Sequence, residues 1–134
     1  MQYVAQEHES DCGVAVLAML TGRTLVETCD WIKWHGRDLQ PAEMHWWLWR
    51  DGFYLRSVKL RVDLPGWSDE EGWPPVPFRP FAPAHYLMVT AAKGGHWVAL
   101  DGDGALLDPW DRARQSLDAY SAVHEIVGVR KESL

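Results

Sequence analysis

Three residues of this chain have the types and the order that acyl-transfer chemistry needs: Cys12, His96 and Asp108. A cysteine attacks a carbonyl carbon as its thiolate, a histidine moves the proton, and a carboxylate orients the histidine ring. Cys12 follows Asp11 at the start of an apolar run that extends to Leu20. If this run is a helix, its unpaired N–H groups and its dipole favour negative charge on the sulfur. The sequence therefore predicts a thiol hydrolase.

The distance in sequence between His96 and Asp108 is compatible with two neighbouring strands. Residues 101–104, Asp-Gly-Asp-Gly, are typical of a β-hairpin turn, with Leu100 facing Ala105. The returning strand then brings Asp108 close to His96. A carboxylate in that position accepts a hydrogen bond from the ring and selects its tautomer.

Gln6 supplies a candidate donor for the oxyanion that forms when a carbonyl is attacked. Its side-chain amide and the backbone N–H of Cys12 are the two donors that we expect there. Two glycines at positions 94–95, directly before His96, leave room for a substrate backbone beside the imidazole.

These motifs resemble those of the C39 peptidase family, papain-like cysteine peptidases best known as leader-cleaving domains of bacteriocin exporters. The resemblance spans nearly the whole chain and is carried by Gln6, Asp11-Cys12-Gly13, Gly95-His96-Trp97-Val98 and Leu107-Asp108-Pro109. It implies a papain-like α+β fold, with N-terminal helices packed on a C-terminal antiparallel β-sheet. It also implies that Gln6, Cys12, His96 and Asp108 are the oxyanion donor, nucleophile, base and orienting carboxylate. Exporter-linked members continue into membrane and ATPase domains. Here we expect a free-standing domain. Because such a domain need not cleave a leader peptide, leader cleavage is one possible reaction and not the only one.

The chemistry of the triad leaves two other functions open. An amidase, deamidase or transpeptidase uses the same groups, because the walls of the pocket choose the leaving group and the acceptor. A non-catalytic module that binds a peptide or protein through tryptophans is the third interpretation, since the chain has nine tryptophans. Most of these are expected in the core, but Trp46, Trp47 and Trp49 cannot share one helical face.

Composition limits the remaining possibilities. A chain of 134 residues with 47% hydrophobic and 24% charged residues is expected to form one domain, residues 1–134. The net charge of -6 and the scattered basic residues argue against nucleic-acid binding. No segment is long and apolar enough to predict a membrane span, and no signal peptide is visible, so we expect a cytoplasmic protein with both cysteines reduced. The histidines and cysteines lack zinc-site spacing, and no metal or cofactor is predicted. The partner is a peptide or protein substrate, and the oligomeric state stays open.

Capping residues and helix-breaking residues predict the helices and strands that hold these side chains in place. Asp11 and Thr24 are candidate N-caps, with Glu27 completing a capping box after Thr24, and Gly36 and Gly52 are candidate helix stops. Helices are predicted over 11–21, 24–34, 41–51 and, shorter, 112–120; strands over 53–60, 85–91, 96–100, 105–108 and 123–131. Residues 63–83 are rich in proline and glycine and predict an irregular segment, whose place between the two halves of the site is compatible with a wall of the cleft.

Overall fold

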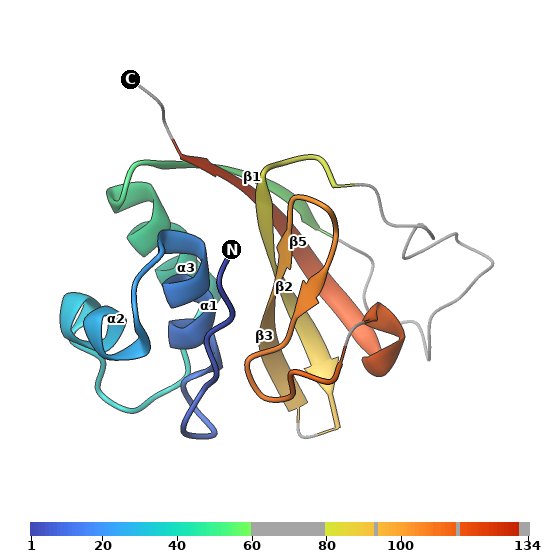
Figure 1. The fold of residues 1–134 in the computed structure, drawn as a ribbon, viewed down its shortest axis with the longest axis horizontal. Helices are drawn as coiled ribbons and strands as arrows, with labels where there is room; N and C mark the ends of the chain where they lie inside the picture. Colours follow the sequence, from blue (N-terminus) through green and yellow to red (C-terminus); the bar gives the residue numbers. More distant parts are fainter. Residues whose placement is uncertain (60–79, 93, 115, 132–134) are drawn as a thin grey trace.

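Three helices lie on one side of an antiparallel sheet, so the prediction of an α+β fold is confirmed (Figure 1). The computed structural model describes residues 1–59, 80–92, 94–114 and 116–131. The helices are α1 (Cys12–Thr21), α2 (Leu25–Ile32) and α3 (Pro41–Arg50). The strands are β1 (Phe53–Lys59), β2 (Ala84–Ala91), β3 (Gly94–Asp101), β4 (Leu106–Leu107) and β5 (Ala122–Lys131). Their order across the sheet is β1-β5-β2-β3-β4.

Helix α1 is the central helix, and every residue from Cys12 to Leu20 is buried. A helix that is apolar all round must be covered all round, and α1 packs against α2, α3, β2 and β3. Asp11 is its N-cap residue, but the predicted capping role of the side chain is wrong. Its carboxylate turns away from the helix and accepts the N–H groups of Glu7 and His8, each at 3.1 Å. Asp11 thus shapes the loop that precedes Cys12.

Helix α2 begins as predicted and ends earlier than predicted. The Thr24 side chain accepts the N–H of Glu27, whose carboxylate accepts the N–H of Thr24, so the capping box is confirmed. The helix ends at Ile32 because Lys33 adopts a left-handed conformation, with φ of 52°. The predicted stop at Gly36 is therefore wrong, although Gly36 also has positive φ.

Helix α3 starts at Pro41 and is followed by Gly52 at φ of 85°, as its breaker residues predicted. Trp47 packs edge-on against Trp31 of α2, with ring centroids 5.3 Å apart. Trp46 and Trp49 lie on the surface, with exposed fractions of 49% and 65%. The prediction that the three tryptophans cannot all be buried is confirmed.

The β3–β4 hairpin brings the last third of the chain back toward the helices. Its register pairs Leu100 with Leu106 rather than with Ala105, because the turn closes through the Asp101 N–H and the Ala105 carbonyl at 3.0 Å. The returning strand β4 is short and covers only Ala99 and Leu100 of β3. One residue beyond β4, the chain reaches Asp108.

Two other predicted elements differ from the structure. The predicted helix over 112–120 is wrong: in the described part of this segment, the helical structure is one 3-10 turn, Leu117–Ala119. The predicted irregular segment 63–83 falls largely outside the described residues, which resume at residue 80. Its suggested place at the cleft therefore stays a prediction.

The sheet separates two hydrophobic cores. The larger core lies between the sheet and the helices and includes Leu17, Met44, Tyr86 and Trp97. The smaller core lies on the other face, and its buried members are Leu87, Val89, Val98, Leu100, Leu106, Tyr120, Val123 and Ile126. Within the described residues no single helix is long and apolar enough to cross a membrane; only α1 and α2 together, meeting at 104°, pass by length and composition.

Candidate active site

His96 and Asp108 are brought into direct contact at the end of the hairpin. Nε2 of His96 lies 2.7 Å from Oδ1 of Asp108. His96 is 9% exposed, and Asp108 is fully buried. The same Oδ1 also accepts the backbone N–H groups of Trp110, at 2.8 Å, and Asp111, at 3.3 Å. The turn after β4 therefore fixes one oxygen of the carboxylate against the imidazole.

Cys12 approaches the same imidazole from the N-terminus of α1. Cys12 is 4% exposed, and it lies close enough to the ring to raise the pKa of His96. Because Nε2 of His96 faces Asp108, Nδ1 is the ring nitrogen that remains for a second partner. Burial lowers the pKa of His96, but the hydrogen bonds with Asp108 and Cys12 outweigh it and raise the pKa to about 9. The ring is thus held as an imidazolium at neutral pH, beside the Asp108 carboxylate.

Two side chains that the sequence analysis did not identify hold the other oxygen of Asp108. Oδ2 accepts a hydrogen bond from the Tyr120 hydroxyl at 2.6 Å and one from Nη1 of Arg114 at 3.1 Å. Burial raises the pKa of Asp108, but hydrogen bonds from His96 and Tyr120 outweigh it and keep the pKa well below its usual range. Neither residue lies in a periodic pattern that points to position 108, so no local signal identifies them.

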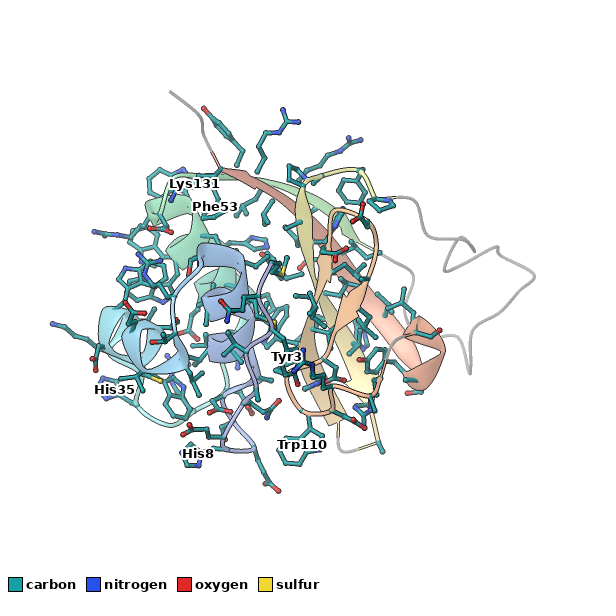
Figure 2. All side chains as sticks on the ribbon, in the orientation of Figure 1. Tyr3, His8, His35, Phe53, Trp110 and Lys131 are labelled. Carbon is teal, nitrogen blue, oxygen red and sulfur yellow. The ribbon has the colours of Figure 1, made fainter. Side chains whose placement is uncertain are left out.

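Gln6 lies at the mouth of the site on the N-terminal segment. Its backbone N–H donates to the Pro109 carbonyl at 2.9 Å, next to a bond at 2.6 Å from the Tyr3 hydroxyl to the Asp108 carbonyl. Figure 2 shows Tyr3 between the helices and the sheet. Nε2 of Gln6 donates to the His8 carbonyl at 2.7 Å, which leaves one amide hydrogen for another acceptor. Among the described residues, its buried Oε1 has no hydrogen-bond partner.

A cleft of about 300 Å³ opens beside the imidazole. Its floor and walls come from the N-terminal loop, the loop before α3, the β2–β3 turn and the segment after β4. Trp110, which is 43% exposed, stands at its edge, at the same end of the molecule as His8 (Figure 2). The lining residues are Gln6, Glu9, Ser10, Asp38, Ala91, Ala92, Gly94, Gly95, His96, Trp110 and Arg114. The predicted oxyanion donor and the predicted base thus face one cavity.

The two positions before His96 differ in whether the backbone requires glycine. Gly94 has φ of 115°, a conformation that other residues rarely adopt. Gly95 has no such constraint, and a Cβ atom there would meet nothing within 4 Å. The backbone conformation and packing therefore do not require glycine at position 95, and its missing side chain leaves the cleft open beside the imidazole.

The remaining cysteine and histidines do not join the site. Cys29 is half-buried in α2, and both cysteines are free thiols. His85 is fully buried on β2, where its Nε2 accepts the N–H of Phe81 at 3.2 Å. In the part of the chain that the structure describes, no three His, Cys, Asp or Glu side chains are grouped to hold a metal ion.

Comparison of the sequence with protein-family models and with curated proteins finds no match. A function for this chain has to be argued from the chemistry of the site.

Proposed function

We propose that this protein is a cysteine peptidase in which Cys12 is the nucleophile, His96 the general base and acid, and Asp108 the orienting carboxylate. The observation that carries the proposal is the buried hydrogen bond between His96 and Asp108, with Cys12 close enough to the imidazole to raise its pKa. A histidine whose pKa is about 9 holds its proton at neutral pH and can stabilise a neighbouring thiolate. The resemblance of these motifs to the C39 family points to the same roles.

The acylation step uses the groups as they stand. The Cys12 thiolate attacks the carbonyl carbon of the scissile peptide bond, and the electron pair moves to the oxygen. That oxyanion receives hydrogen bonds from the backbone N–H of Cys12 and from the free amide hydrogen of Gln6. Nδ1 of His96 then gives its proton to the departing amine, the C–N bond breaks, and a thioester remains on Cys12.

Deacylation returns the enzyme to its starting state. The neutral His96 takes a proton from a water molecule, and the hydroxide attacks the thioester carbon. The second oxyanion uses the same two donors, and its collapse breaks the C–S bond. The products are a carboxylic acid and the Cys12 thiolate, beside a reprotonated His96. Throughout, Asp108 accepts the hydrogen bond from Nε2 and keeps the ring from turning.

We take the fold as a papain-like arrangement and the location as the cytoplasm. The support for the first is a nucleophile at the N-terminus of a buried helix, packed against the sheet that carries the base and the carboxylate. The support for the second is a catalytic chemistry that needs a free thiol, which a reducing compartment preserves. The family resemblance suggests that the substrate is a precursor peptide from which a leader is cleaved.

Alkylation of the two cysteines tests the activation of Cys12 with an internal control. Burial, with smaller contributions from Asp11 and Asp30, raises the pKa of the Cys29 thiol. At about pH 5.5, iodoacetamide should therefore modify Cys12 at least tenfold faster than Cys29, as read by peptide mass spectrometry. A His96→Gln exchange should remove the difference. Equal slow labelling of both thiols in the native protein would end the proposal.

Digestion of a peptide library tests the reaction itself. The native protein should release new amino termini, and Cys12→Ala should release none. Acyl transfer to an added amine without cleavage, or ammonia release from side-chain amides, would favour the amidase, deamidase or transpeptidase alternative. The exposed Trp46 and Trp49 are the observation behind a binding module. Peptide binding that Cys12→Ala leaves unchanged, without turnover in the native protein, would favour that module.

A further inference from the structure

We propose that Tyr120 and Arg114 are positioning residues, which hold the Asp108 carboxylate in the orientation that directs Oδ1 at His96. The proposal concerns the site of the proposed function, but neither its geometry nor its test depends on a substrate. It assigns two residues that act through Asp108 rather than on the scissile bond.

The two oxygens of Asp108 have separate sets of donors. Oδ1 accepts hydrogen bonds from His96 and from two backbone N–H groups. Among the described residues, Oδ2 accepts hydrogen bonds from the side chains of Tyr120 and Arg114. A carboxylate that has donors on both oxygens cannot rotate without breaking several hydrogen bonds in a buried site, where each loss is costly. The pair on Oδ2 thus selects the rotamer that His96 needs.

Tyr120 is suited to this role because its ring is fixed. The residue is 2% exposed and belongs to the smaller core, packed among residues of β3, β4 and β5. Burial and the nearby Asp108 raise the pKa of its hydroxyl, so the hydroxyl stays protonated and donates. A donor on a ring that cannot move fixes the position of its acceptor.

Arg114 completes the pair from the side of the cleft. Its Nη1 reaches Asp108, its Nε lies 3.7 Å from Asp111, and its Cζ lies 5.9 Å from the centre of the Tyr120 ring. The side chain is 26% exposed and lines the cleft together with His96. A planar guanidinium with several donors can bind two carboxylates at once and still present an edge to the cavity.

A positioning role and a purely electrostatic role predict opposite shifts in the titration of His96. Loss of a donor or a positive charge near Asp108 would strengthen the attraction between the carboxylate and the imidazolium, and would raise the midpoint. Loss of orientation would weaken the hydrogen bond from His96, and would lower the midpoint toward that of a free histidine. The titratable groups around this pair are Cys12 from α1, Tyr3 from the N-terminal segment, Asp111 and Arg114 from the loop, and Tyr120 before β5.

The test follows the ring signals of His96 by NMR against pH in the 134-residue chain. Tyr120→Phe should lower the midpoint from about 9 by about one pH unit, because one charge-assisted hydrogen bond is lost. Tyr3→Phe is the matched control: it removes the same group from the same residue, but from the main-chain carbonyl of Asp108. It should leave the midpoint unchanged. An unchanged or higher midpoint in Tyr120→Phe would overturn the proposal.

Arg114 provides a second test if Tyr120→Phe does not fold. Arg114→Gln should lower the midpoint, whereas Arg114→Lys, which keeps a charged donor, should restore most of it. A rise in Arg114→Gln would assign an electrostatic role only and overturn the positioning role. The titration separates this proposal from the proposed function. If the protein shows these shifts but cleaves no peptide, the positioning role of Tyr120 and Arg114 stands and the peptidase function is wrong.

Discussion

Within the described residues, two carboxylate–histidine pairs lie beside the sheet, and their hydrogen bonding differs. At the cleft, Nε2 of His96 lies 2.7 Å from Oδ1 of Asp108. The two oxygens of Asp108 also accept hydrogen bonds from two backbone N–H groups and two side chains, those of Trp110, Asp111, Arg114 and Tyr120. Beneath α3, Nε2 of His45 lies 3.9 Å from Oε1 of Glu125, which is too far for a hydrogen bond. The same residue types therefore form a rigid network in one place and a loose cluster in the other.

The loose cluster is held mainly by one hydrogen bond, from the Ser57 hydroxyl to Glu125. Among the described residues, the buried Nε2 of His45 and the buried hydroxyl of Tyr86 have no hydrogen-bond partner. Burial raises the pKa of Tyr86, with a smaller contribution from Glu125. A buried carboxylate beside a histidine therefore does not by itself form a rigid site. The hydrogen-bond donors around the carboxylate fix its orientation.

Removal of the charge should affect the two carboxylates very differently. Asp108→Asn places an amide among donors that need an acceptor, and should cost about 3–5 kcal/mol of unfolding free energy. Glu125→Gln keeps an oxygen for Ser57 and should cost about 1 kcal/mol. Denaturant unfolding at neutral pH measures both. Asp108→Asn should also slow the acidic alkylation of Cys12 more than tenfold, which Glu125→Gln should not. Equal costs would mean that the network at the cleft adds no stability.

The pH dependence of stability should come from the cleft pair. The pKa of His96 rises from 6.5 in the unfolded chain to about 9 in the folded protein. Its contribution is therefore fully present below pH 6.5 and is lost as pH rises through 9. This loss amounts to about 3 kcal/mol of unfolding free energy. His96→Gln should remove this decline, and His45→Gln should keep it. A decline that survives in His96→Gln would assign the titration to another group.

Local patterns in the sequence predicted the elements that carry Cys12, His96 and Asp108. The apolar run after Cys12 predicted a helix that is buried on every side, and the Thr24 capping box marked the start of the next helix. The glycine-rich turn after β3 brought Asp108 to His96 even though the predicted register was one residue off. The contact survived this error because the side chain of Asp108 lies beyond the paired residues of β4.

Long-range side-chain partners could not be predicted in the same way. Tyr120 and Arg114 approach Asp108 from a segment that was expected to be helical and is mostly irregular. The Asp11 side chain had two possible sets of backbone donors, and in the structure it accepts those of the loop before α1. Both outcomes depend on tertiary packing, which hydrophobic periodicity and capping signals do not record.

The smallest expected effect comes from a Tyr→Phe exchange made once in each of the two cores that flank the sheet. Tyr120→Phe removes a hydroxyl that binds a charged acceptor, and should cost about 1.5–3 kcal/mol of unfolding free energy. Tyr86→Phe removes a buried hydroxyl that has no hydrogen-bond partner among the described residues, and should change stability by less than about 0.5 kcal/mol, or increase it. Thermal unfolding of the two variants gives the comparison directly. If Tyr86→Phe is as costly as Tyr120→Phe, the hydroxyl of Tyr86 has a partner such as a bound water, and the cluster beneath α3 is as well satisfied as the one at the cleft.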